Sequence, residues 1–111
     1  MSAIMKPDDR KVWILKWIKE HSPQGVDVLN SDFVDDYVAA TGVRMEPTCW
    51  GASKCPTLGS DLSAMARCGA LDRGRIGLGA NWQPGFPKWV WAYWPGRAAY
   101  LYEPKESKEQ L

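Results

Sequence analysis

Residues 54–68 read KCPTLGSDLSAMARC, and this stretch places one helix at the centre of the fold. Leu58, Leu62 and Met65 recur at the i, i+4, i+7 spacing that marks one buried face of a helix. Pro56 suits the first turn, where its missing N–H has no helical partner to lose. The pattern therefore predicts a helix over 54–68 that packs on a core.

The residues that follow favour a β-hairpin. Residues 71–78 read LDRGRIGL and alternate loosely, whereas 88–94 read KWVWAYW and are rich in aromatic and β-branched residues. The glycine- and proline-rich segment 79–87 is expected to be the loop between the strands. The polar stretch 103–111 is expected to be a disordered tail, so that one domain covers 1–102.

Two further helices are predicted before this region, over 9–21 and 31–41, together with a short strand at 26–29. The segment 43–53 has no clear period and is expected to be a loop. The buried stripe expected in the first helix is Trp13, Ile14, Trp17, Ile18 and His21. The stripe expected in the second helix is Phe33, Val34, Tyr37, Val38 and Ala40.

The order of elements is helix, short strand, helix, helix, strand, glycine-rich loop, strand, which belongs to the α+β class. This order resembles the winged helix-turn-helix superfamily, through the helix pair 31–42 and 54–68 and the hairpin 71–94. The resemblance implies a winged helix with three helices, a small N-terminal strand and a C-terminal β-hairpin wing. The connection 43–53 is longer than a tight helix-turn-helix uses.

A narrower likeness lies in residues 54–62, KCPTLGSDL, and 85–91, GFPKWVW. These segments resemble small, largely uncharacterised proteins of bacteriophages and prophages. That resemblance implies a phage origin and a regulatory or host-directed role.

The winged-helix resemblance implies that helix 54–68 enters the major groove of double-stranded DNA while the hairpin touches the backbone. At 3.6 residues per turn, Ser60, Ser63, Ala64 and Arg67 point away from the buried stripe. Arg67 is then the base reader, and the arginines after it contact phosphates. The expected DNA-binding residues are Thr57, Ser60, Ser63, Arg67, Arg73, Arg75 and Lys88. The alternative for each is a merely solvated polar side chain.

A protein-interaction module on the same fold is the alternative function. The formal net charge is only +1, which does not by itself favour nucleic acid. The strand at 88–94 places aromatic side chains on one face, and the second helix carries an acidic cluster. Such a strand can bind a host protein, a second copy of the chain as a homodimer, or stacked single-stranded bases. The residues expected to carry this alternative are Trp89, Trp91, Tyr93, Asp32, Asp35 and Asp36.

Catalysis, cofactors and metals find little support in the sequence. His21 is the single histidine, and no motif pairs it with a nucleophile, so no enzyme is expected. Cys49, Cys55 and Cys68 lack the close pairs of a structural zinc site and are expected to be buried, inert thiols. An odd cysteine count and the lack of a visible secretory or membrane-spanning run predict a cytoplasmic protein, in a bacterial host if phage-derived, with no membrane partner.

Overall fold

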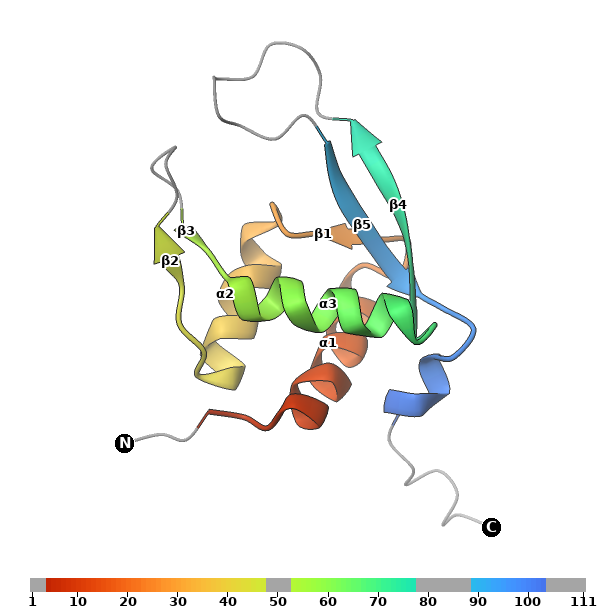
Figure 1. The fold of residues 1–111 in the computed structure, drawn as a ribbon, viewed down its shortest axis with the longest axis horizontal. Coiled ribbons are helices and arrows are strands. Elements are labelled where there is room, and N and C mark those ends of the chain that lie inside the picture. The colour runs from red at the N-terminus through yellow and green to blue at the C-terminus, as the bar shows by residue number, and fades with distance from the viewer. Residues whose placement is uncertain (1–3, 48–52, 78–88, 104–111) are drawn as a thin grey trace.

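A computed structural model describes residues 4–47, 53–77 and 89–103 (Figure 1). These residues form an α+β fold with three helices and a small three-stranded antiparallel sheet, as the sequence predicts, and the arrangement is compatible with a winged-helix-like one. In chain order the elements are α1 (Pro7–His21), β1 (Val26–Asp27), α2 (Ser31–Thr41), β2 (Glu46–Pro47), β3 (Ser53–Lys54), α3 (Pro56–Arg67), β4 (Leu71–Gly77), β5 (Trp89–Pro95) and the short 3-10 helix η1 (Ala99–Tyr102).

The helices begin and end where local chemistry favours it. Proline opens both α1 and α3, at a position whose N–H would have no partner within the helix. At the start of α2 the Asn30 side chain accepts a hydrogen bond of 3.1 Å from the backbone N–H of Phe33. The same helix ends at Gly42, whose φ of 80° is the left-handed conformation that glycine adopts without strain.

The core lies between the three helices and the base of the sheet. The predicted stripe of α3 is confirmed, because Leu58, Leu62 and Met65 are fully buried. They pack with side chains of α1, α2 and the first residues of the hairpin. The largest completely buried side chains are Ile14, Leu15, Ile18, Phe33, Tyr37, Thr41, Leu58, Leu62, Met65 and Leu71.

The three-stranded sheet has the order β1-β5-β4, which makes β4 an edge strand. Its register pairs Arg73 with Tyr93 and Arg75 with Trp91. Near the base of this hairpin Leu71 and Tyr93 enter the core, whereas the remaining length rises away from the helices (Figure 1). The far end of the hairpin therefore extends beyond the three helices (Figure 1).

Several local expectations were wrong. The segment 43–53, expected to be a plain loop, contains β2 and the first residue of β3, which pair at residues 46–47 and 53–54. Lys54, expected in the third helix, belongs to β3, and the helix begins at Pro56. Residues 48–52 lie outside the described residues. The strand expected at 26–29 stops at Asp27, whose carboxylate accepts a 2.8 Å hydrogen bond from the N–H of Leu29 and turns the chain.

Two stripe residues are also exposed rather than buried. His21 stacks on the ring of Trp17 with centroids 4.5 Å apart, at the rim of the core rather than inside it. Ala40 faces solvent, and Thr41 takes the buried position instead, because its hydroxyl donates a 2.7 Å hydrogen bond to the carbonyl of Tyr37. The sequence analysis expects a disordered tail over 103–111. Its first residue, Glu103, instead forms a 2.6 Å ion pair with Lys19 of α1. Residues 104–111 lie outside the described residues.

Candidate nucleic-acid interface

A buried ionic network fixes how α3 is rotated about its own axis. Asp61 of α3 is only 4% exposed, and both its oxygens accept hydrogen bonds from the Arg10 guanidinium, at 2.8 Å and 3.1 Å. The hydroxyl of Tyr37 donates a third bond to Asp61, with a length of 2.6 Å. Because Arg10 lies on α1 and Tyr37 on α2, one carboxylate ties all three helices together and sets which face of α3 points outward.

The contacts of this network shift the pKa values of Arg10 and Tyr37. The hydrogen bond to Asp61 raises the pKa of Arg10. Burial, followed by the hydrogen bond to Asp61, raises the pKa of Tyr37 well above its usual range. Arg10 therefore stays charged and Tyr37 stays a neutral donor at any physiological pH.

The sequence analysis did not predict this network, although the sequence contains one indication of it. Asp61 follows Leu58 by three residues and precedes Leu62 by one, so it belongs to the buried face of α3. A carboxylate on such a stripe requires a cationic or hydrogen-bonding partner. The identity of that partner depends on how the three helices pack, which no local pattern reveals.

The outward face of α3 carries small and mostly polar side chains. Ser60 and Arg67 are exposed, while Thr57, Ser63 and Ala64 are partly exposed. A side chain at Gly59 would meet nothing within 4 Å, so this part of the helix lies open. The only acidic residue of α3 is Asp61, which faces inward. The α3 residues expected to contact DNA therefore share one accessible, acid-free face.

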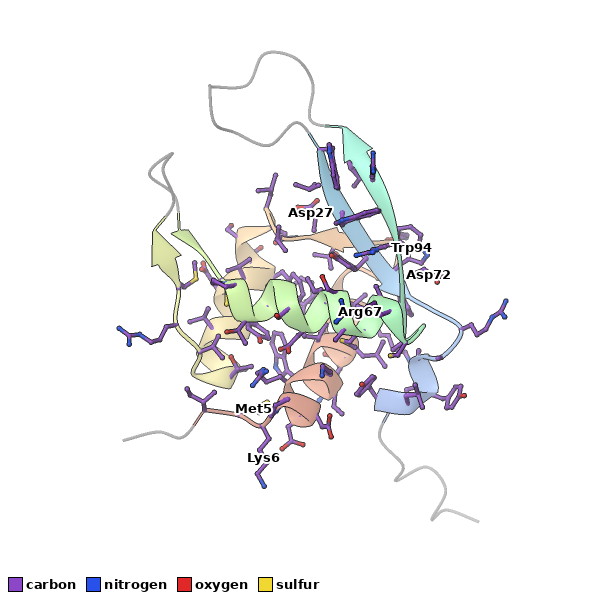
Figure 2. All side chains as sticks on the ribbon, viewed as in Figure 1. Met5, Lys6, Asp27, Arg67, Asp72 and Trp94 are labelled. Carbon is purple, nitrogen blue, oxygen red and sulfur yellow. The ribbon has the colours of Figure 1, made fainter. Side chains whose placement is uncertain are left out.

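Figure 2 shows Arg67 on the half of α3 from which the chain leaves for β4. The β4–β5 hairpin beyond it brings together the basic strand and the aromatic strand, which the sequence analysis treated as separate features. The Arg73 guanidinium carbon lies 4.3 Å from the ring centroid of Trp91, and that of Arg75 lies 4.5 Å from Trp89 and 5.6 Å from Trp91. The two tryptophan rings meet edge to face, with centroids 5.1 Å apart. We call these four residues the arginine–tryptophan ladder; Lys88, the other cation expected here, lies outside the described residues.

Tyr93 does not belong to that surface. It is 4% exposed and lies in the hydrophobic core, opposite Val26 of β1. Trp94 points to the other face of the sheet, where a side chain at Gly74 would come within 3.0 Å of its ring. Asp72 pairs with Trp94 in the register and is placed beside it near the base of the wing (Figure 2). Of the three aromatic residues expected on a platform, only Trp89 and Trp91 are near the surface.

The acidic cluster lies on a different part of the molecule. Asp32, Asp35 and Asp36 are exposed on α2, and Asp36 accepts a 2.8 Å hydrogen bond from the indole N–H of Trp17. A hollow of about 320 Å³ opens between the end of α1 and the start of α2. Its lining residues are Trp17, His21, Ser22, Asn30, Asp32 and Asp36.

The cysteines only partly follow expectation. Cys55 is partly exposed, and Cys68 is exposed rather than buried because it follows the last turn of α3, with its sulfur 3.4 Å from the carbonyl oxygen of Met65. Cys49 lies outside the described residues.

Within the described ranges, no three histidine, cysteine or acidic side chains come together as a metal site. Over the same ranges, none of the helices has the length and apolar character needed to cross a bilayer.

No protein-family model, curated protein or solved structure matches this chain. Its function is therefore inferred from its own side chains and their geometry.

Proposed function

We propose that the protein binds double-stranded DNA, with α3 in the major groove and the β4–β5 hairpin as a wing against the sugar–phosphate backbone. One observation carries this proposal. The accessible face of α3 is small, polar and free of acids, and it leads through Arg67 into a wing that holds Arg73 and Arg75. In this proposal the fold is a winged helix.

The dimensions of this face suit a groove. A helix enters the major groove most closely where its side chains are short, and Ser60, Ser63, Ala64 and the open Gly59 provide that surface. Serine and threonine hydroxyls reach phosphates or base edges with single hydrogen bonds. Arg67, the one long cation on this face, is the base reader in this arrangement, because a guanidinium matches the two acceptors of guanine.

The distribution of charge also favours this side of the molecule. Figure 1 shows α3 in front of α1 and α2. The exposed acids Asp32, Asp35 and Asp36 all lie on α2, so their repulsion toward phosphates is kept away from the outward face of α3. Along α3 and β4 the exposed charged residues are Arg67, Arg73, Arg75 and the single acid Asp72, an excess of cations on a protein whose formal net charge is only +1.

A matched pair of charge substitutions tests the proposal. Ser60→Glu adds an acid to the proposed groove surface, and Ser31→Glu adds the same acid to the exposed start of α2. Binding is measured by fluorescence anisotropy on a random-sequence duplex at low salt, where even non-specific binding is strong. We expect Ser60→Glu to weaken binding about tenfold, equivalent to about 1.4 kcal/mol, and Ser31→Glu to leave it unchanged. A wild-type protein that does not bind, or equal losses in both variants, would contradict the proposal.

The mode of binding suggests a biological role. In the proposed complex, one helix and one hairpin occupy a stretch of duplex. Occupation of a site is how transcription regulators act, and we include that role in the proposal.

A protein partner is the second candidate function, and the hollow between α1 and α2 is the observation that favours it. Asp32 and Asp36 line this hollow, and their carboxylates suit an arginine or lysine side chain. An arginine-containing peptide, titrated into isotope-labelled protein, is expected to shift the resonances of Trp17 and His21. Asp32→Asn should abolish those shifts and leave DNA binding intact, whereas no shift in the wild type would remove this candidate.

A further inference from the structure

The arginine–tryptophan ladder holds its two cations in place before any ligand arrives. The Arg75 guanidinium lies over the ring of Trp89 and also near that of Trp91, and the Arg73 guanidinium lies over Trp91. The edge-to-face contact of Trp89 with Trp91 fixes the rings relative to each other. A guanidinium over an indole face is attracted to the ring quadrupole and loses rotamer freedom. The four side chains are therefore ordered as one unit on the wing.

The hydrogen-bonding capacity of these arginines is unused within the described chain. A guanidinium in contact with a ring uses its face, whereas its five N–H donors lie in its plane. The side chains of Arg73 and Arg75 make no hydrogen bond or ion pair with any described residue, unlike Arg10, whose donors are taken by Asp61 and the carbonyl of Met5. The nearest acid in sequence, Asp72, lies on the opposite face of the strand.

We propose that Trp89 and Trp91 are positioning residues, whose indoles hold the guanidinium groups of Arg73 and Arg75 as a fixed pair of donors for phosphodiester oxygens. This inference rests on the proposed DNA-binding function and assigns the tryptophans a role in it. The two arginines are two residues apart on one face of a strand, which separates them by about 7 Å along it. That separation is suited to neighbouring phosphates of one nucleic-acid strand.

The same geometry argues against a platform for stacked bases. Trp91 is contacted by both arginines and by the neighbouring ring, and one face of Trp89 is taken by Arg75. A base that stacked on Trp91, or on the face of Trp89 that Arg75 covers, would have to displace a cation first. The ladder therefore offers a ligand its guanidinium groups on these faces, and guanidinium recognises oxyanions in a bidentate manner.

The role of the tryptophans predicts a separation between affinity and salt dependence. Leucine at 89 or 91 keeps both positive charges but frees the arginine side chains, whose ordering must then occur on binding. We expect each of Trp89→Leu and Trp91→Leu to weaken duplex binding about three- to tenfold. The slope of log K against log salt should stay unchanged, since the number of phosphates neutralised is the same.

The controls separate positioning from charge and from folding. Arg73→Gln/Arg75→Gln should lower the slope by about 0.9 for each phosphate that is no longer neutralised. Trp89→Phe and Trp91→Phe keep a ring under each guanidinium and should recover most of the affinity. Trp89 is 39% exposed, so its leucine variant is expected to fold even if that of the partly buried Trp91 does not. Unchanged affinity in Trp89→Leu, or weaker binding together with a lowered slope, would overturn the proposal.

A second measurement tests phosphate binding by the arginine–tryptophan ladder without involving α3. The side-chain Nε–Hε resonances of Arg73 and Arg75 are followed by NMR while inorganic phosphate is added, with the exposed Arg97 as internal reference. We expect both ladder resonances to move at lower phosphate concentration than that of Arg97, and Trp89→Leu to remove the difference for Arg75. If the duplex does not bind but this difference is present, the groove proposal fails and the ladder stands. If all three arginines respond alike, the ladder is wrong.

Discussion

Removing the carboxylate of Asp61 is expected to destabilise the fold more than most single substitutions in this protein. In Asp61→Ala the guanidinium of Arg10, whose side chain is only 13% exposed, loses both bonds to its partner. The buried hydroxyl of Tyr37 loses its acceptor in the same step. A cation and a hydroxyl are then left in the interior with nothing in the protein to compensate their lost hydration.

The magnitude follows from these two losses. Breaking a buried ion pair by removing one partner costs about 3–5 kcal/mol, because the remaining charge is uncompensated. An orphaned hydroxyl adds about 1–3 kcal/mol. Arg10 is not fully buried and can turn toward water, which offsets part of the sum. We therefore expect a loss of about 3–5 kcal/mol, a large share of the 5–15 kcal/mol typical of a whole domain.

Urea denaturation followed by far-UV circular dichroism measures this loss. The midpoint should fall by about 1 M or more, given slopes of about 1–3 kcal/mol per molar for small proteins. The triple variant Arg10→Met/Tyr37→Phe/Asp61→Leu, which removes the polar partners together, should recover much of the stability. A loss below about 1 kcal/mol in Asp61→Ala would show that the network does not hold the helices as described.

Three further outcomes are expected. Leu62→Ala should cost about 2–5 kcal/mol in the same denaturation assay because the side chain is fully buried, and a midpoint near the wild-type value would contradict the packing of α3. The raised pKa of Tyr37 means that its contribution is complete below about pH 10, the pKa of an unfolded tyrosine, and is lost as pH rises further, by up to about 1.4 kcal/mol per pH unit. Tyr37→Phe should flatten that alkaline decline, and an unchanged pH profile would argue against it. Arg67→Ala should weaken duplex binding by about 1–3 kcal/mol and relax the preference at one base pair, and binding equal to wild type would exclude Arg67 as the base reader.

The elements with strong local patterns were predictable. The Leu58/Leu62/Met65 spacing identified α3 and its buried face, and the aromatic run at 88–94 identified β5, because helical and strand periods leave their marks in neighbouring residues. The same reasoning failed at His21, which has the right spacing but lies beyond the edge of the core. It failed differently at Ala40, where the next residue, Thr41, points to the core instead. Periodicity fixes a direction around the helix axis and says nothing of how far the core extends along it.

The candidate site was only partly predictable, because its key contacts depend on register. Arg75 lies on the same face as Trp91 since they are direct partners across the hairpin. A slip of one residue would place them on opposite faces. The composition of the connecting segment 78–88 does not determine the register in which the two strands of the hairpin pair. The sequence therefore indicated a basic strand and an aromatic strand as two separate features rather than one ladder.

The position of β4 at the margin of the sheet bears on whether two copies of this chain associate. An open strand edge is a template for pairing with an identical strand, which is a route to dimers and to aggregates. In an antiparallel pairing about a twofold axis normal to the sheet, the registers centred on this strand bring Arg73 or Arg75 opposite an arginine of the other copy. Like charges directly opposite are destabilising across a strand pair. The arginines proposed to bind phosphate would thus also disfavour pairing of β4 with β4 of a second copy. A polyanion that neutralises these arginines would reduce the repulsion between the two strands.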